Sequence, residues 1–480
     1  MNRLIPLLLL LAAAAAPRRA AAQEDNLHRS TSIYEAPTDP AVVEKLEAWQ
    51  DVKFGMLIHW GLYAVPGIME SWTLCNEDWI DRPDGMSYHD YQEWYWGLNR
   101  VFDPVNFDPE GWADAAAAAG MKYVVFTTKH HDGFNLFDTE QTDYKITAGP
   151  FQDNPRANVA EHVFRAFRDR DFMIGAYYSK PDWHNQDFWW DKYATPDRNV
   201  NYDIRRYPER WKSYQDFTYR QIEELMTGYG AVDILWLDGG WVRPKSTVTD
   251  EVRAWGAPIP DFSQEIPMDS IAAMARAAQP GLIIADRTVH GPYENYQTPE
   301  RRVPEERIAH PWESNLPLGD NWGYVPNDPF KPTAEVIHTL VEIVAKGGNF
   351  LLGVGPTSDG VIPLEVVDSL QRIGDWMDVN GEAIYGTRSP EHYRDGENVF
   401  FTAKGDERFA IALRGSDTAL TEITWTGHVP AGRELRLLGY DKPLRFRETN
   451  GTYTVSLPEK LSAELRNSPA LVVAFTVDAR

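Results

Sequence analysis

The chain has 480 residues, 43% hydrophobic and 25% charged, which is an ordinary globular composition with room for one large domain and a smaller one. A formal net charge of −24 repels phosphate backbones and anionic membranes, and so excludes nucleic acid as the main partner. The single cysteine, Cys75, excludes a disulfide within the chain and a thiolate metal site.

The first 22 residues have the pattern of a signal peptide. Asn2 and Arg3 supply a polar and basic start, the apolar stretch 4–16 follows, and alanines at 20–22 precede Gln23. The apolar stretch is too short to anchor the chain across a bilayer, and no other stretch has the pattern of a membrane span. We therefore expect a signal peptide over residues 1–22 and a secreted or periplasmic protein.

From residue 50 onward, short apolar runs alternate with helix-like stretches. Strands are expected at 54–60, 122–128, 173–178, 232–237, 282–285 and 350–354, and helices at 110–120, 159–170, 210–229, 268–278, 334–346 and 364–379. Apolar strands that are each followed by a helix predict a parallel sheet buried on both faces. The two candidate folds are a (β/α)8-like, TIM-type barrel and an open doubly wound sheet. The irregular stretch 288–332 hides any strand that it contains.

Polar side chains at or just past several strand ends favour the barrel. In strand order they are His59, His130 with His131, Tyr178, Asp238 and Arg287. The carboxyl ends of barrel strands converge on one site, whereas in an open sheet most strand ends lie apart. We therefore predict a (β/α)8-like catalytic domain over residues 23–388.

After about residue 386 the pattern changes to short alternating runs separated by turn residues. These runs lie at 398–403, 408–413, 422–425, 434–438, 453–457 and 470–477. Short, regularly spaced strands of this kind predict an antiparallel sheet structure. We expect a small C-terminal β-sandwich over residues 389–480.

Asp238 is the residue that most strongly suggests chemistry. It ends a strand that carries Trp236, and two glycines follow it, so a substrate could approach its carboxylate closely. A helix N-cap is the alternative interpretation, since Asp is a favoured capping residue. The 18 Trp and 22 Tyr residues leave a similar choice between sugar-binding platforms and a large aromatic core.

Glycoside hydrolysis requires a second carboxyl group near the first. Glu294, Glu300 and Glu313 are candidates in the irregular stretch, and each could equally be a solvated loop carboxylate. His130 and His131 could suggest a metal, but adjacent strand residues point to opposite faces, so one ion would rarely bind both. We expect imidazoles that bind sugar hydroxyls, with no metal and no cofactor.

At these residues the chain resembles the α-L-fucosidases of glycoside hydrolase family 29. The similar segments are 53–61, 128–134, 236–239, 349–356 and 379–386, in the order of the family. The resemblance covers roughly residues 45–390. It implies a (β/α)8-like barrel followed by a β-sandwich, and exo-acting release of terminal α-L-fucose with retention of configuration, through a covalent fucosyl–enzyme intermediate and without a metal. The implied partners are fucosylated oligosaccharides or glycoconjugates.

The resemblance also implies roles for individual residues. The nucleophile position falls on Asp238 and the acid/base on Glu300, with Glu294 as the alternative. Of Tyr177 and Tyr178, which the pattern hardly separates, Tyr178 is chosen. The expected substrate-binding residues are His59, Glu70, Trp72, His130, His131, Tyr178, Trp236, Arg287 and Trp312. A longer loop after Trp72, over residues 74–87, is expected to cover the aglycone side.

Three other functions remain open from the sequence. A retaining hydrolase of similar design could act on another sugar, such as an α-galactoside. A carbohydrate-binding protein could keep the fold without catalysis, although both carboxylates are present here. A metal-dependent hydrolase would lose activity with a chelator.

Overall fold

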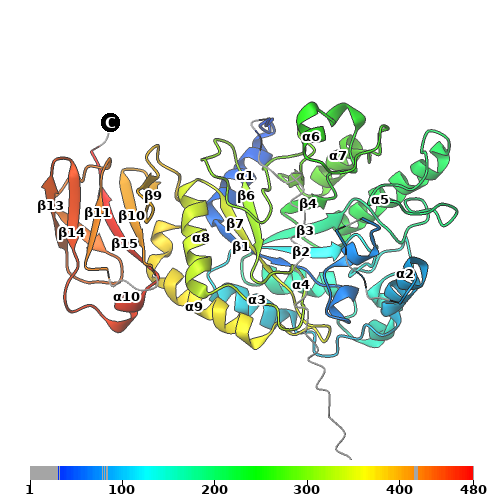
Figure 1. Cartoon of the computed structure of the whole chain (residues 1–480), viewed down its shortest axis with the longest axis horizontal. Coiled ribbons are helices and arrows are strands. Elements are labelled where there is room, and N and C mark those ends of the chain that lie inside the picture. Colours follow the sequence, from blue (N-terminus) through cyan, green and yellow to red (C-terminus); the bar gives the residue numbers. More distant parts are fainter. Residues whose placement is uncertain are drawn as a thin grey trace, which may run out of the picture.

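A barrel-like α/β unit and a curved antiparallel sheet lie side by side in the computed structural model of the chain (Figure 1). The structure describes residues 31, 33–77, 79–80, 82, 85–415 and 420–478. The expected signal peptide over residues 1–22 lies outside the described residues. Within the described part, no helix is both long and apolar enough to cross a membrane.

Seven parallel strands form the sheet of the barrel-like unit, in the order β5-β4-β3-β2-β1-β7-β6. Their bounds are β1 Phe54–Ile58, β2 Tyr123–Lys129, β3 Met173–Ser179, β4 Ile234–Asp238, β5 Ile283–Asp286, β6 Glu313–Pro317 and β7 Asn349–Val354. Nearly all of their side chains are buried, which explains the uniformly apolar runs. The six strands expected from the sequence are present within a few residues, and β6 is an additional one.

Helices cover the outside of this sheet (Figure 1). The expected helices correspond to α3 Pro109–Ala118, α4 Val159–Arg168, α5 Pro208–Gly228, α7 Met268–Ala278, α8 Thr333–Ala345 and α9 Leu364–Asn380. In α4, the buried Val163, Phe164 and Phe167 lie on one face at helical spacing. Further α-helices in the described part of the chain are α1 Pro40–Val52, α2 Tyr88–Trp96, α6 Asp250–Ala254 and α10 Ala463–Asn467.

The irregular segment 293–301 lies between β5 and β6, where an eighth strand would close the barrel. On one side its backbone hydrogen-bonds to β5, from the Asn295 nitrogen to the Ile284 oxygen at 2.9 Å. On the other side it bonds to β6, and the Arg301 nitrogen donates to the Asn315 oxygen at 2.8 Å. The segment therefore completes the ring without forming a regular strand, and it places Glu300 at the edge of the barrel interior.

Alternating strand residues fill the barrel interior. On β4 these are Ile234 and Trp236, and they belong to one buried cluster with Tyr177 of β3. In the sheet register Tyr177 lies opposite Trp236, and Ser179 lies opposite Asp238. Because successive side chains of a strand point to opposite faces, Asp238 shares the inward face with Trp236 and Tyr177.

The C-terminal unit is one eight-stranded antiparallel sheet that curls around its own core, in the order β11-β14-β13-β12-β15-β10-β9-β8. The bounds are β8 Arg394–Asp395, β9 Val399–Lys404, β10 Glu407–Leu413, β11 Glu422–Trp425, β12 Glu434–Leu437, β13 Leu444–Thr449, β14 Thr452–Ser456 and β15 Ala470–Thr476. The Trp376 indole on α9 donates to the Ala470 oxygen at 3.0 Å, which joins this sheet to the first unit. The division expected at residue 388 falls between α9 and β8.

Candidate active site

A cavity with about 390 Å³ of free space lies at the carboxyl ends of β1 to β6. Its lining combines apolar, imidazole and charged side chains from segments far apart in the sequence. They are Leu57, His59, Trp72, His130, His131, Tyr177, Trp236, Asp238, Trp241, Arg287, Glu300, Asn315 and Trp322.

Asp238 is held at the end of β4 by donors on both carboxylate oxygens. Its Oδ1 accepts from the Gly239 backbone nitrogen at 2.8 Å and from Arg287 at 2.7 Å, and its Oδ2 accepts from the Tyr177 hydroxyl at 2.7 Å. Gly239 has a φ of +89°, and a Cβ there would lie 2.3 Å from the Cδ of Pro181. No helix begins at residue 239, since the next helical turn starts at Lys245, so Asp238 is not a helix cap.

Arg287 joins the two carboxyl groups of the cavity. Its Nη1 donates to Asp238 and its Nη2 donates to Oε2 of Glu300, both at 2.7 Å. The guanidinium lies over the Trp236 ring, 4.1 Å from its centroid. Burial opposes the charge of Arg287, but Asp238 and Glu300 outweigh it and raise the pKa of the guanidinium above its ordinary value.

Three histidines line the cavity in the neutral form. Burial lowers the pKa of His130 to about 4, even though Asp238 and Glu300 act in the opposite direction. Burial likewise lowers the pKa of His59 and of His131 well below the ordinary value. Neutral imidazoles can accept a hydrogen bond at one nitrogen and donate one at the other, which suits sugar hydroxyls.

His130 and His131 lie on the same side of the chain, and the expectation from strand alternation is wrong. The two rings are 4.3 Å apart between centroids, and both line the cavity. The strand rule does not hold here because β2 ends at Lys129. Each histidine and Asp238 offer one ligand atom, and these atoms lie within 4.8 Å of one another, so the described residues could share a cation. Arg287 already supplies a positive charge to Asp238 at this place.

One wall of the cavity is formed by Trp72 and Trp241. The guanidinium of Arg198 lies 4.7 Å from the Trp72 ring centroid and 5.1 Å from that of Trp241. Glu77 accepts from Nε and Nη2 of Arg198, each at 2.7 Å. This ion pair ties the segment after Trp72 to the loop after β3. Through its contacts with both rings, Arg198 stabilises the aromatic wall.

Tyr178 does not reach the cavity, and the choice of this residue over Tyr177 is corrected. Its hydroxyl donates to Oε1 of Gln221 at 2.8 Å, on α5 outside the barrel, and accepts from Nζ of Lys129 at 3.0 Å. Tyr177 contacts Asp238 instead. The cause is strand alternation, since Tyr177 is paired with the inward-facing Trp236 and Tyr178 with Leu237.

Trp312 and Glu70 also lie outside the cavity lining. Trp312 precedes β6 and its ring packs against Gly348, at the opposite end of the strands. Glu70 is buried, and its Oε1 accepts from the backbone nitrogens of Trp322, at 2.6 Å, and of Gly323. Glu70 thus holds Trp322, which does line the cavity.

The other two candidate carboxylates are buried away from the cavity. Glu294 accepts from the Thr288 backbone nitrogen at 2.8 Å and pairs with His290 at 2.8 Å. Glu313 accepts from the Tyr123 hydroxyl at 2.8 Å and from the Trp236 indole at 3.2 Å. Glu300 is the only one of the three candidates that lines the cavity, and its side chain is 22% exposed.

Leu57, Trp241, Asn315 and Trp322 line the cavity without having been predicted from the sequence, and Tyr177 was the alternative that was not chosen. Trp241 could have been found, because it directly follows the two glycines after Asp238. Asn315 and Trp322 lie in the irregular stretch, where no periodicity marks a face.

Two carboxyl groups among aromatic and neutral imidazole side chains, at the carboxyl-end face of a barrel-like α/β fold, are the arrangement that a glycoside hydrolase requires. The family model described as Alpha-L-fucosidase matches residues 21–382. The chain therefore belongs to the α-L-fucosidase family and is an enzyme of that class.

Individual relatives agree with this assignment. The chain is 29% identical over 442 residues to plasma alpha-L-fucosidase of Rattus norvegicus, which covers 88% of this chain and 87% of that one. Among solved structures, it is similar to alpha-L-fucosidase isoenzyme 1 from Paenibacillus thiaminolyticus, with 30% identity, a TM-score of 0.72, and coverage of 92% and 100%. A Thermotoga maritima alpha-fucosidase in complex with fucose matches with 26% identity, a TM-score of 0.70, and coverage of 92% and 100%.

Proposed function

We propose that this protein is an exo-acting, retaining α-L-fucosidase that hydrolyses terminal α-L-fucose from oligosaccharides or glycoconjugates. Asp238 is the nucleophile and Glu300 is the acid/base. The observation that carries the proposal is the bridge from Arg287 to both carboxylates, at 2.7 Å each. The relative that was solved with fucose supports the choice of sugar.

The first step forms a covalent intermediate. An Asp238 oxygen attacks the anomeric carbon as the bond from that carbon to the leaving oxygen breaks, and the bonding electrons go to the leaving oxygen. Glu300 gives that oxygen a proton, so the aglycone leaves as an alcohol. In the second step Glu300 removes a proton from water, the water oxygen attacks the same carbon, and Asp238 is released as a carboxylate.

We infer retention rather than inversion from the family to which the chain belongs. Retaining enzymes hold their carboxyl groups about 5–5.5 Å apart, whereas inverting enzymes leave about 6.5–9.5 Å for a water molecule. Arg287 contacts both Asp238 and Glu300, so the two carboxyl groups lie near enough to act on one glycosidic bond.

The depth of the cavity supports exo-action. Leu57, Tyr177 and Trp236 line it and are almost completely buried in the barrel interior. A cavity with such a floor admits the end of a glycan but not a continuous chain. The neutral His59, His130 and His131 would bind the hydroxyls of the terminal sugar.

We also infer that the chain is exported. The basic start and apolar stretch of residues 1–22 support this, as do the plasma relatives. Detection of a shortened N-terminus on the protein outside the cytoplasm would test it.

The role of Glu300 is tested against Glu294, a nearby glutamate that is buried in other contacts. Glu300→Ala should slow the release of fucose from oligosaccharides strongly and from aryl fucosides with good leaving groups much less, because the latter need no proton. Glu294→Ala should not show this dependence on the leaving group. The reverse pattern would assign the acid/base to Glu294.

The role of Asp238 is tested by chemical rescue. Asp238→Ala should abolish turnover of an aryl fucoside, and azide should restore it with formation of the fucosyl azide of inverted configuration. Full activity without azide would refute the nucleophile assignment. Proton NMR of the wild-type reaction should show α-L-fucose as the first product if the configuration is retained.

A further inference from the structure

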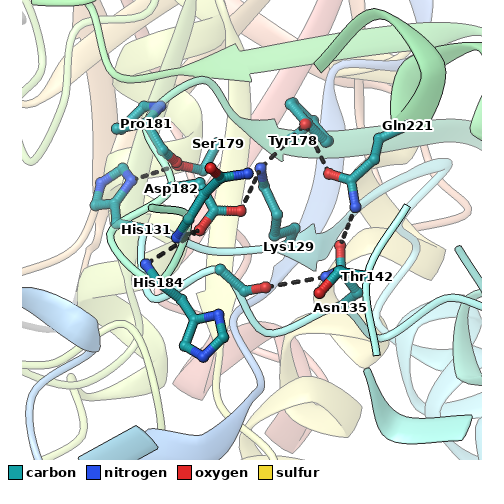
Figure 2. A network of polar contacts seen from close by, with 12 residues as sticks. Lys129, His131, Asn135, Thr142, Tyr178, Ser179, Pro181, Asp182, His184 and Gln221 are labelled. Atoms are coloured by element: carbon teal, nitrogen blue, oxygen red, sulfur yellow. Dashed lines mark hydrogen bonds and ion pairs between the residues drawn. The ribbon is translucent and has the colours of Figure 1, made fainter. Parts of the chain in front are cut away.

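Ser179, which shares the inward face of β3 with Tyr177, lies between the His131 ring and a backbone carbonyl. Figure 2 shows the His131 ring, Ser179 and Pro181 in one line of hydrogen bonds. The Ser179 Oγ lies 2.7 Å from Nδ1 of His131 and donates to the Pro181 oxygen at 2.5 Å. Ser179 is completely buried, so bulk water does not replace His131 or the Pro181 oxygen as its hydrogen-bond partner.

The number of available protons determines the direction of these two bonds. A serine hydroxyl has one hydrogen, and a carbonyl oxygen can only accept. The hydrogen of Ser179 is therefore engaged by Pro181, and the contact with His131 requires a hydrogen on Nδ1. A neutral imidazole with a hydrogen on Nδ1 carries a lone pair on Nε2.

Nε2 of His131 lies 3.7 Å from Oδ2 of Asp238. Two acceptors face each other at this point, and neither can donate to the other. A hydroxyl group of a bound ligand could donate to Nε2 here, close to the carboxylate that is proposed to react.

We propose that Ser179 is a positioning residue that, through the Pro181 carbonyl, holds His131 as the Nδ1–H tautomer, so that Nε2 accepts a hydrogen bond from a substrate hydroxyl beside Asp238. The tautomer is a property of the substrate-free protein, and only its use in sugar binding rests on the proposed function.

A buried ion pair holds the carbonyl in place. Asp182 follows Pro181, and its Oδ2 accepts from Nζ of Lys129 at 3.3 Å (Figure 2). The Trp183 backbone nitrogen donates to the His131 oxygen at 2.8 Å. These contacts tie the loop that carries the Pro181 carbonyl to the segment that carries His131. The hydrogen bonds from the His131 ring lead through Ser179 to this loop, and the loop bonds back to the His131 backbone.

The plane of the His131 ring is also restricted. The rings of Trp72, Trp183 and Trp241 surround it with centroid distances of 5.3, 5.1 and 5.2 Å. Rotation of the imidazole would have to displace these large side chains. Packing therefore fixes the ring orientation, and Ser179 fixes which nitrogen carries the hydrogen.

Nitrogen NMR of the full-length enzyme, labelled with 15N-histidine, tests the assignment at pH 7. The His131 signals are assigned by their loss in His131→Phe. We expect a protonated Nδ1 and an unprotonated Nε2 in the wild type, with the Nε2 signal changing when L-fucose is added. A hydrogen on Nε2 in the substrate-free wild type would overturn the proposal, whether or not any variant folds.

Variants test whether Ser179 is the cause. In Ser179→Ala the His131 signals should shift toward the Nε2–H tautomer, and kcat/KM for an aryl fucoside should fall about tenfold, as expected for loss of one hydrogen bond. Ser179→Thr keeps the hydroxyl and should restore the wild-type tautomer. An unchanged tautomer in a folded Ser179→Ala protein would refute the role of Ser179.

Thr128→Val is the matched control. The Thr128 hydroxyl is also buried and donates to a backbone oxygen, that of Tyr177 at 2.6 Å, but it forms no hydrogen bond with an imidazole among the described residues. This variant should leave the His131 signals unchanged, and a tautomer shift in it would refute the specific role of Ser179. A wild type that has the expected tautomer but releases no fucose would refute the proposed function alone.

Discussion

Replacement of the buried Glu313 by glutamine should make the free energy of unfolding less dependent on pH. Burial raises the pKa of Glu313 from 4.5 to about 7, while hydrogen bonds from Tyr123 and Trp236 act in the opposite direction. Between these two values the native protein keeps a proton that the unfolded chain has lost. The free energy of unfolding therefore falls as the pH rises, and the stabilising contribution is complete below pH 4.5 and lost above about pH 7.

The expected size follows from the same two values. At about 1.4 kcal/mol for each pH unit between 4.5 and 7, ionisation of Glu313 costs the native state about 3 kcal/mol. Glutamine resembles the protonated carboxyl in shape and cannot ionise. Relative to wild type, Glu313→Gln should therefore gain about 3 kcal/mol in the free energy of unfolding between pH 4 and pH 8.

Urea unfolding followed by tryptophan fluorescence measures this difference at each pH. Glu47→Gln, at an exposed position on α1, is the control and should run parallel to wild type. Titration of all other groups cancels in the comparison. Parallel curves for wild type and Glu313→Gln would refute the reasoning, because they would mean that the buried carboxyl does not titrate in this range.

Further outcomes follow from the cavity contacts. Tyr177→Phe removes a hydrogen bond to a carboxylate, worth about 1.5–3 kcal/mol, and should lower kcat/KM for an aryl fucoside at least about tenfold. Tyr178→Phe, whose hydroxyl bonds to Gln221 outside the cavity, should lower the melting temperature more than the activity. The Asn315 side-chain amide is buried in the cavity lining, and neither of its polar atoms is hydrogen-bonded in the described structure. We therefore expect it to bind substrate. Asn315→Leu should raise KM about tenfold, and an unchanged KM would contradict this. Dialysis against EDTA should leave activity unchanged, because Arg287 already supplies the positive charge at Asp238; loss of activity that returns with a metal would contradict this.

The sequence is most informative where chemistry and periodicity coincide. Uniformly apolar runs correctly indicated β1 to β5 and β7, because strands buried on both faces admit few polar residues. Asp238 could be singled out because it directly ends such a run. Arg287 could be placed in the site for the same reason, as it follows β5 by one residue.

Positions within a strand are harder to predict than the strand itself. Tyr177 and Tyr178 are chemically the same, and only the register against β4 shows which of them faces inward. One step along a strand reverses the direction of the side chain. The same alternation was wrongly extended to His130 and His131, which lie beyond the end of β2.

Closure of the barrel could not be predicted from the sequence. The segment 293–301 forms backbone hydrogen bonds to β5 and β6 without a regular strand, so no repeat in its side chains reports its position. Glu300 reaches the cavity because of this closure. Trp312 stands before β6 at the other end of the strands, and a local sequence pattern does not distinguish the two ends.

Ligand binding is expected to be coupled to uptake of a proton, because Arg287 contacts the proposed acid in the substrate-free site and the first step needs that acid with its proton. Nη2 of Arg287 contacts Oε2 of Glu300 at 2.7 Å, and a neighbouring positive charge favours the carboxylate. The first chemical step needs Glu300 with its proton. A ligand that enters between the guanidinium and Glu300 weakens this contact and excludes water, and both effects favour the neutral carboxylic acid.

A pH-indicator dye in weak buffer at pH 7 can detect this uptake. A fucoside with sulfur in place of the leaving oxygen serves as the ligand, since it is neutral and is hydrolysed slowly. Wild-type enzyme should take up as much as one proton per site, whereas Glu300→Gln, which has no carboxyl at this position, should take up almost none. Equal uptake by the two proteins would place the proton elsewhere, and no uptake by either would show that the ligand leaves the bridge between Arg287 and Glu300 intact.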